Sequence, residues 1–432
     1  MLRMNYKLAE LEEKNAPIMT SIIGAGQMGR GMTSQMIRMK GMKPAIVADI
    51  NIDNVIAAFE NSGLTKDDYI ITNKLSEANT YLEKGKYIAT ENSELGAKAN
   101  LISAAVDATG VPEVGAKVAI DAINEGKHIC MLNVETDVVI GPMLKKLADN
   151  AGVIYTGSAG DEPGAVKELY DFATAAGFDV RVIGKGKNNA IDLDANPTTL
   201  AEYAAKRGVS PKMQTAFTDG TKTMVELTAM ANATGFIPDI RGGHGPEAEV
   251  KDLPNLFRPT EEGGILQNGY GKVEWVNGIA PGVFVIISSD LPFVKHEMNY
   301  LSMGEGPNWV LYRPYHLCSL ETPLTVAKAV LDNTSTLVPM DGGLVCETVA
   351  VAKKDLKAGD MLDGIGGYTV YGTVDTHENM LKDNGVPLGV ITKGTKLIKD
   401  VKKGQTITYD MVELDENSLI VQLRKLQDRF FG

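Results

Sequence analysis

The chain has 432 residues, of which 44% are hydrophobic and 23% charged, and its formal net charge at pH 7 is −12. This length predicts two or three domains with an ample core. The negative charge argues against nucleic acid as the main partner, because that role needs a basic face. A small anionic substrate remains compatible, because it needs only a local cluster of Lys and Arg.

The N-terminal stretch, residues 1–15, is polar and charged, and it predicts a leading helix rather than a signal peptide. No apolar run reaches 18 residues, so no membrane span is expected. The three cysteines, Cys130, Cys318 and Cys346, form no CxxC pair and are expected as small, mostly buried side chains. These features favour a cytoplasmic protein.

A glycine motif follows the first predicted strand. The apolar run 21–23 leads into Gly-x-Gly-x-x-Gly, and a helix over 30–39 and a strand over 44–49 come next. The first glycine allows a tight turn, the second lets the backbone approach a pyrophosphate, and the third lets the helix pack on the strand. The alternatives are a glycine-rich turn without a ligand or a Rossmann domain that has lost its cofactor. We expect a nicotinamide cofactor on the helix N-terminus, bound by Gly24, Gly26, Gln27, Met28 and Gly29.

The end of the second strand bears on the choice of cofactor. Asp49 stands where a carboxylate usually accepts hydrogen bonds from the ribose 2′-hydroxyl, which favours NAD. A helix cap or turn acid is the plainer interpretation. Arg30, Arg38 or Lys43 could still receive a 2′-phosphate, so NADP stays open.

Strands and helices continue to alternate up to residue 156, which predicts a parallel sheet covered on both faces in a Rossmann domain over 1–156. Thr109 and Gly110 follow a strand that ends at Asp107, so they are candidate cofactor contacts. The predicted strands lie in 100–107, 128–133 and 153–156, and the predicted helices are 112–125 and 141–150.

Residues 157–336 read as a catalytic and dimerisation domain. Helices are expected over 162–176 and 221–232, and a strand over 282–287. A helix over 321–332 would return to cover the Rossmann sheet. Residues 337–432 read as a small β domain with approximate twofold symmetry, because Lys-Asp-Leu-Lys-Ala-Gly at 354–359 recurs as Lys-Asp-Val-Lys-Lys-Gly at 399–404.

The segment Gly184-Lys-Gly-Lys-Asn-Asn189 is the second candidate for a site. Lys185, Lys187 and Asn188 combine positive charge and directional donors with an open backbone, which suits a phosphate, a carboxylate or a polarised carbonyl. A solvated basic turn is the alternative.

Two further clusters flank helix starts. Asp161 and Glu162 open a helix after a sheet strand, either as acids stabilised by the helix dipole or as part of an active-site loop. Asp219 reads as a cap, and Lys222 and Glu226 lie one turn apart on a mostly apolar helix. A charged stripe on a buried helix must face a cleft or a partner, and a lysine there can exchange a proton with the reacting oxygen.

Two Arg-x-x-His clusters, Arg241 with His244 and Arg313 with His316, are candidate contacts for a substrate anion. Each histidine could equally be a structural hydrogen-bonding residue. No metal motif is present in the sequence. The metal site is therefore unknown, and Mg²⁺ or Mn²⁺ bound by distant carboxylates stays open.

Together these motifs resemble the bacterial 1-deoxy-D-xylulose-5-phosphate reductoisomerase-like oxidoreductases, which are built like homoserine dehydrogenase and carry a C-terminal SAF domain. The resemblance covers nearly the whole chain. It rests on residues 24–31, 131–135, 168–172, 184–189, 231–235, 244–246, 280–284 and 313–316, with 351–359 and 389–404 for the SAF-like part.

The resemblance implies an α/β fold with a Rossmann doubly wound parallel sheet, an α+β catalytic domain and a small β domain. It also implies a homodimer. It places Asp219 and Lys222 where homoserine dehydrogenase has its catalytic Asp and Lys, and Asn133 and Glu135 beside the nicotinamide. Asp49-Ile50-Asn51 supplies no clamp for a 2′-phosphate, which departs from the NADPH-dependent members.

Three functions follow as hypotheses. The first is a reductoisomerase forming 2-C-methyl-D-erythritol 4-phosphate, in which Lys222 donates a proton, Lys187 holds the substrate anion, and Glu135 or Glu162 handles proton transfer or a divalent ion. The second is a dehydrogenase of a sugar acid, a tetritol derivative or a homoserine-like substrate. The third is a nucleotide-bound sensor. Lys185, Asn188, Glu226, Arg241, His244, Arg313 and His316 are the candidate substrate contacts.

Overall fold

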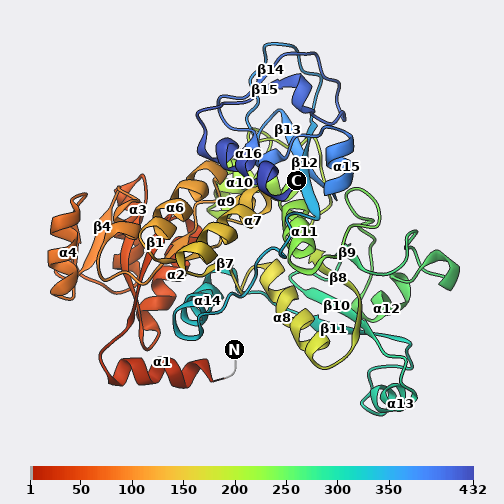
Figure 1. The fold of residues 1–432 in the computed structure, drawn as a ribbon, viewed down its shortest axis with the longest axis horizontal. Helices are drawn as coiled ribbons and strands as arrows, with labels where there is room; N and C mark the ends of the chain where they lie inside the picture. The colour runs from red at the N-terminus through yellow and green to blue at the C-terminus, as the bar shows by residue number, and fades with distance from the viewer. Residues whose placement is uncertain (1–2) are drawn as a thin grey trace. The chain divides into compact units, whose positions relative to one another are not determined.

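The computed structural model describes residues 3–432 (Figure 1). Contacts between Cα atoms divide the chain into two compact units, each assembled from separate segments. Unit 1 comprises residues 1–161, 317–338 and 417–432. Unit 2 comprises residues 162–316 and 339–416.

Unit 1 is built on a seven-stranded sheet with the order β3-β4-β2-β1-β5-β6-β7. Every neighbouring pair of strands is parallel. This confirms the predicted Rossmann-type α/β class. The strands are β1 Ile18–Ile23, β2 Met42–Ala48, β3 Tyr69–Ile71, β4 Tyr87–Thr90, β5 Ala104–Asp107, β6 His128–Met131 and β7 Tyr155–Gly157.

Helices cover this sheet. An apolar core joins side chains of α1, α2, α3 and α14 to the central strands, so the late helix α14 packs on the sheet beside α2. The helices of unit 1 are α1 Met4–Glu13, α2 Gln27–Arg38, α3 Ile52–Asn61, α4 Leu75–Glu83, α5 Leu95–Lys98, α6 Pro112–Asn124, α7 Val134–Ala151, α14 Cys318–Asp332 and α16 Leu419–Phe431.

Helix α7 differs from its predicted extent of 141–150, because it starts at Val134 and runs straight through Pro142. A proline inside a helix removes one backbone donor and disturbs the turn before it. In this turn, Met143 N donates to Gln427 Oε1 at 3.1 Å, and Gln427 Nε2 donates to Val139 O at 2.9 Å. One amide from α16 therefore satisfies the two backbone groups that would otherwise pair with each other.

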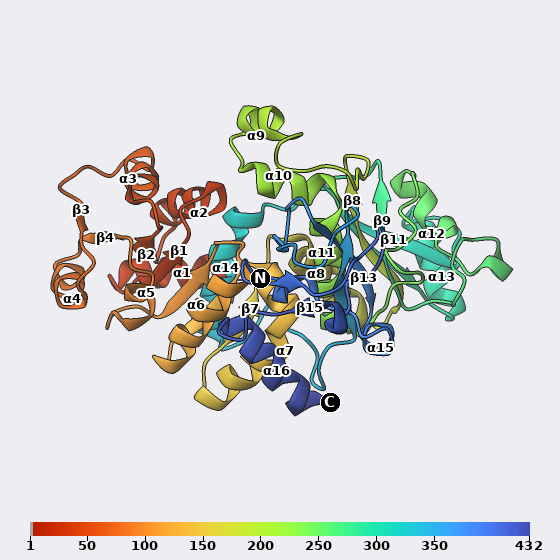
Figure 2. The same ribbon diagram turned by 90° about the horizontal axis from the view of Figure 1, so that it is seen from above.

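The start of α16 is also held by a side chain of the Rossmann segment. The Glu113 carboxylate on α6 accepts hydrogen bonds from Ser418 Oγ at 2.5 Å, Leu419 N at 2.9 Å and Ile420 N at 3.0 Å. These are N–H groups that a helix cannot satisfy internally. Helix α16 packs along α6 and α7, as Figure 2 shows.

Unit 2 contains a four-stranded mixed sheet with the order β11-β10-β8-β9. Its apolar side chains divide between two clusters, one under helices α8 and α11 and the other under α12 and its neighbouring loops. The strands are β8 Asp179–Lys187, β9 Lys272–Asn277, β10 Val283–Ser288 and β11 Asn308–Arg313. The helices are α8 Glu162–Ala175, α9 Ala201–Arg207, α10 Pro211–Thr218, α11 Thr221–Thr234, α12 Leu253–Leu256, α13 Pro292–Tyr300 and α15 His377–Lys382.

In residues 339–416, β12 Cys346–Ala352 pairs with β13 Val370–Thr376, and β14 Lys396–Leu397 pairs with β15 Val412–Glu413. The two copies of the predicted sequence repeat pair with each other, because Leu356 N donates to Val401 O at 2.8 Å and Val401 N donates to Leu356 O at 3.0 Å. This supports the approximate twofold symmetry. The boundary at residue 337 and the likeness to the SAF fold stay predictions, since residues 339–416 group with unit 2 and 417–432 with unit 1.

Within residues 3–432, no helix has both the length and the apolar character needed to cross a bilayer.

Candidate active site

The glycine motif forms the turn between β1 and α2, and the local geometry explains why glycine stands at each of its three positions. Gly24 has φ +100°, and a side chain there would meet Ala108 O at 2.8 Å. A side chain at Gly29 would lie 1.7 Å from Gly24 O, so the helix can approach the turn only with glycine. A Cβ atom at Gly26 would have no neighbour within 4 Å, which leaves room for a ligand beside the backbone. The turn thus fits a pyrophosphate next to the start of α2, where Gln27 and Met28 stand.

Asp49 holds this turn in place. Its Oδ2 accepts a hydrogen bond from Ala25 N at 2.7 Å, and its Oδ1 accepts one from Asn51 N at 2.9 Å. Asn54 Nδ2 also donates to Asp49 Oδ1 at 3.2 Å, whereas Oδ2 can still accept a second hydrogen bond. The predicted ribose contact therefore stays a prediction, and the structure adds a second function for the carboxylate as an anchor for the glycine turn.

A buried polar cluster lies where β5 and β6 end. Asp107 Oδ1 accepts from Thr109 N at 3.0 Å, and Asp107 Oδ2 accepts from Asn133 Nδ2 at 2.9 Å. Burial raises the pKa of Asp107 to about 6, although these hydrogen bonds oppose the rise. Asn133 Nδ2 also donates to Val111 O at 3.0 Å, so the amide secures the loop that carries Thr109 and Gly110.

Asn133 is buried and caps α7, because its Oδ1 accepts a hydrogen bond from Thr136 N at 3.3 Å. The structure therefore gives Asn133 a positioning role beside its predicted contact with the cofactor. Glu135 lies buried in the next turn, and its charge contributes to the raised pKa of Asp107. The parts predicted for Asn133 and Glu135 in binding and catalysis stay predictions.

The second site starts from the alternation of Gly and Lys along β8. Side chains two residues apart on a strand point to the same face. A side chain at Gly184 would lie 2.1 Å from Glu274 O, and one at Gly186 would lie 2.5 Å from Ala280 N. The glycines thus allow close packing on one face, while Lys185 and Lys187 project from the other, toward α8 and α11.

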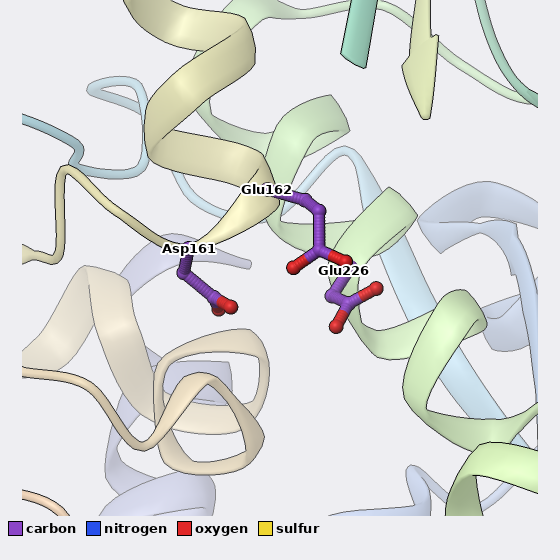
Figure 3. A group of neighbouring side chains, drawn as sticks. All are labelled: Asp161, Glu162 and Glu226. Atoms are coloured by element: carbon purple, nitrogen blue, oxygen red, sulfur yellow. The ribbon is translucent and has the colours of Figure 1, made fainter. Parts of the chain in front are cut away.

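Lys185 is buried and bridges two carboxylates. Its Nζ donates to Glu162 Oε1 at 2.6 Å and also to Glu226 Oε2. Burial acts to lower the pKa of Lys185, but the two carboxylates together raise it above the usual lysine range. The pKa of Glu226 is raised by burial and by repulsion from Glu162, while Lys185 and Lys222 act to lower it. Figure 3 shows Glu162 and Glu226, together with Asp161, the residue before Glu162 in the chain.

Lys187 has a different environment. Its Nζ donates to Asn189 Oδ1 at 2.8 Å and to Phe217 O at 3.0 Å. Both acceptors are neutral. Burial, with repulsion from Lys185, lowers the pKa of Lys187 to about 8. This lysine therefore loses its charge at a much lower pH than an ordinary lysine does.

A cavity of about 540 Å³ in unit 2 collects most of the predicted substrate-site residues. This size suits a small molecule. The predicted residues that line it are Glu162, Lys185, Lys187, Asn188, Lys222, Glu226 and His316. His316 Nε2 lies 3.4 Å from Glu162 Oε1, which connects the histidine to the buried charge cluster.

Two of the other predicted residues have structural partners and do not line this cavity. Asp219 is buried, pairs with Lys353 Nζ at 2.7 Å, and accepts from Thr221 N at 2.9 Å. Its predicted catalytic role stays a prediction. Arg313 donates to Glu168 at 3.1 Å and lies over the ring of Tyr315.

The Arg241-x-x-His244 motif belongs to a loop around Trp275. Trp275 Nε1 donates to Gly242 O at 3.0 Å, and a side chain at Gly245 would lie 2.0 Å from the indole ring. His244 Nδ1 lies 2.7 Å from Glu274 Oε1, and a hydrogen bond with Glu274 raises the pKa of His244. Arg241 donates to Thr406 Oγ1 at 2.9 Å. The hydrogen bond to Glu274 is the structural role considered for His244, and the substrate contacts predicted for Arg241 and His244 stay predictions.

The sequence reasoning missed the cavity wall formed by α9 and α10, which lie next to each other (Figure 2). Arg207 Nη1 donates to the Tyr203 hydroxyl at 3.2 Å, and both side chains line the cavity. Gln214 is buried there, and its Oε1 accepts no hydrogen bond among the residues that the structure describes. The residue types in these helices gave no signal, because the wall exists only after the chain folds.

Residues 160–322 match the family model described as the catalytic domain of oxidoreductase DRL. Every residue that lines the cavity falls within this range. The match spans less than half of the chain. With the glycine turn of the Rossmann sheet, it supports an oxidoreductase of the NAD(P)-binding type.

Two solved structures match the chain at low sequence identity. A probable dehydrogenase from Thermotoga maritima has 13% identity and a TM-score of 0.40, over 74% of this chain and 91% of that chain. The scyllo-inositol dehydrogenase from Lactobacillus casei, solved with NAD(H) and scyllo-inositol, has 11% identity and a TM-score of 0.42, over 75% of this chain and 92% of that chain. No curated protein matches the chain in sequence.

Proposed function

We propose that the protein is an NAD(P)H-dependent oxidoreductase acting on a small phosphorylated or acidic ketose or polyol. The observation that carries the proposal is the cavity lined by Lys185, Lys187 and Lys222 inside the segment that is similar to an oxidoreductase catalytic domain. A nicotinamide bound at the glycine turn would supply or accept the hydride. The side chains of unit 2 would bind the substrate and move the proton.

Lys222 and Lys187 have different parts in this proposal. Lys222 donates a proton to the substrate oxygen during reduction and takes it back during oxidation. Lys187, whose pKa is lowered to about 8, binds the anionic group of the substrate while it is protonated. Lys185 is already committed to Glu162 and Glu226, so its role is to hold these carboxylates.

The specific form of the proposal is the reductoisomerase reaction that yields 2-C-methyl-D-erythritol 4-phosphate. The sequence resemblance supports it. The second candidate is an NAD-dependent dehydrogenase of a sugar acid, a tetritol derivative or a homoserine-like substrate. Asp49 favours the second candidate, because a carboxylate at the end of β2 repels a 2′-phosphate.

The test is the change in reduced-nicotinamide absorbance with NADPH and with NADH. The substrates are deoxyxylulose phosphate and a panel of sugar acids, tetritols and homoserine, each with and without Mn²⁺. Turnover of deoxyxylulose phosphate supports the reductoisomerase, and turnover of another substrate with NAD supports the dehydrogenase. If the cofactor binds but no substrate is turned over, the enzyme proposal fails and a nucleotide-bound sensor takes its place.

The homodimer implied by the resemblance is likewise a proposal. Its measurement is the mass in solution by light scattering, where a monomer would refute it.

A further inference from the structure

The buried carboxylates of Glu162 and Glu226 come from two different helices of unit 2. Glu162 is the first residue of α8, and Glu226 lies on α11. Together with Asp161, the residue before Glu162, they form a group in which one carboxylate oxygen of each residue lies within 4.8 Å of the others, which is a spacing that could hold a metal ion. Paired carboxylates of this kind bind Mg²⁺ or Mn²⁺ in many proteins, or else share a proton. What lies between them decides which chemistry the pair supports.

The group between these carboxylates is the ammonium of Lys185. It reaches them from β8, and its side chain is 7% exposed. It donates to Glu162 Oε1 at 2.6 Å and to Glu226 Oε2, so it contacts one oxygen of each carboxylate. A divalent ion bound at these two oxygens would have to displace the ammonium. It would also face the positive charge of Lys185 at close range in a buried setting, where repulsion is strong.

The cluster already contains two cations. Lys222 lies one helical turn before Glu226, and its charge also stabilises the Glu226 carboxylate. A divalent ion bound between Glu162 and Glu226 would leave the buried Lys185 ammonium without its two partners, which is costly.

We propose that the Lys185 ammonium occupies the place of a divalent cation between Glu162 and Glu226, so that this pair binds no Mg²⁺ or Mn²⁺. The inference rests on the contacts of Lys185 and goes beyond the proposed reaction. Lys185 acts as a positioning residue. It fixes the Glu162 carboxylate, which in turn lies 3.4 Å from His316 at the cavity wall.

The first test is a titration of the full-length protein with Mn²⁺, followed by electron paramagnetic resonance, which needs no substrate. We expect no stoichiometric Mn²⁺ and no change in melting temperature on addition of Mn²⁺ or EDTA. One tightly bound Mn²⁺ per chain that is lost in a Glu226→Gln variant would overturn the proposal.

The second test removes the ammonium. A Lys185→Met variant keeps a long side chain but leaves the two carboxylates facing each other. We expect it to gain one Mn²⁺ per chain and a rise in melting temperature with Mn²⁺ that the native protein does not show. The matched control Lys185→Met/Glu226→Gln should lose the gained ion, and Lys185→Arg, which restores a cation, should gain none.

A folded Lys185→Met variant that binds no Mn²⁺ would refute the equivalence of the ammonium and a divalent ion. If that variant does not fold, the titration of the native protein still decides whether the pair takes a metal. Neither readout depends on turnover, so failure of the proposed reaction and failure of this inference can be told apart.

Discussion

At the scale of single residues, the distinctive feature of the cavity is that three lysines close together in the fold have three different environments. Lys185 is held by two carboxylates, Lys187 by two neutral oxygens, and Lys222 faces the cavity one turn from Glu226. The pKa values of Lys185 and Lys187 are therefore shifted in opposite directions. Their chemistry follows from their partners rather than from the residue type.

The proton-donor role of Lys222 predicts a large loss of rate on substitution. A Lys222→Met variant should reduce kcat by about 10²–10⁴-fold, the usual contribution of general acid–base catalysis, with a smaller change in KM. The measurement is steady-state kinetics with a substrate found in the panel, beside cofactor binding by fluorescence. Lys206→Met, at an exposed lysine paired with Glu202, is the control and should keep full activity. Unchanged kcat in Lys222→Met would remove this role.

The environment of Lys187 predicts the pH dependence of substrate binding. Its pKa is lowered to about 8, so its positive charge is present below that pH and is lost as the pH rises through it. KM for an anionic substrate should therefore rise above about pH 8, while kcat changes less. A Lys187→Arg variant keeps its charge across this range, and the rise in KM should disappear. A rise that persists in Lys187→Arg would assign the titration to another group.

Much of this site could be predicted from the sequence, but its pairings could not. The glycine turn at residues 24–29 was predictable, because glycine spacing carries a local backbone meaning. The Gly-Lys-Gly-Lys run was expected to leave an open backbone, but it lies in β8, where its glycines pack closely against neighbouring backbone. The partner of Asp219 is Lys353, 134 residues later in the chain, and nothing in either local sequence connects them. For the same reason, Gln214 gave no signal, since an amide becomes informative only when its oxygen is buried beside a cavity.

At the scale of elements, α7 shows how a distant segment changes what a local pattern means. The expected helix was 141–150, yet α7 runs from Val134 to Ala151 with Pro142 inside it. In the turn around Pro142, the amide of Gln427 pairs with both Met143 N and Val139 O. Proline disturbs a helix most where the neighbouring backbone N–H and C=O groups have no other partner. Here Gln427 of α16 is the partner of Met143 N and Val139 O.

This arrangement predicts that Gln427 contributes to stability through backbone groups of another helix. A Gln427→Met variant keeps the shape but leaves the buried Met143 N–H without this partner, at a cost of about 1–3 kcal/mol, while Val139 O keeps a hydrogen bond from Arg424 Nη1 at 3.4 Å. We expect a lower midpoint of urea unfolding with an unchanged slope. Leu426→Ala, at a neighbouring exposed position of α16, should have a much smaller effect. Equal effects of the two variants would contradict this account.

At the scale of the whole molecule, unit 1 is assembled from three segments that are far apart in the chain. The last of these, residues 417–432, is anchored by Glu113 and buries Ile420, Val421 and Leu423. Each buried aliphatic side chain contributes roughly 1.5–3 kcal/mol. The Rossmann sheet therefore depends on residues that no glycine motif or strand pattern near the N-terminus would suggest.

Deletion of residues 417–432 is accordingly expected to lower the melting temperature and to weaken cofactor binding, although none of these residues belongs to the glycine turn. Differential scanning fluorimetry with and without NAD measures both effects. A shorter deletion of residues 431–432 is the control, because it removes neither the Glu113 contacts nor the buried side chains. If the variant that lacks residues 417–432 melted at the same temperature as the full-length protein, α16 would be dispensable for stability.

The segmented construction of unit 1 also has a consequence for biosynthesis. Residues 162–416 separate its first segment from α16, and a ribosome adds about 5–20 residues per second. For roughly 10 to 50 seconds, the nascent Rossmann sheet therefore waits with the surface of α6 and α7 uncovered. During that interval this surface is open to chaperones and to other emerging chains. Unit 1 is therefore completed only when α16 has been synthesised and packs on α6 and α7.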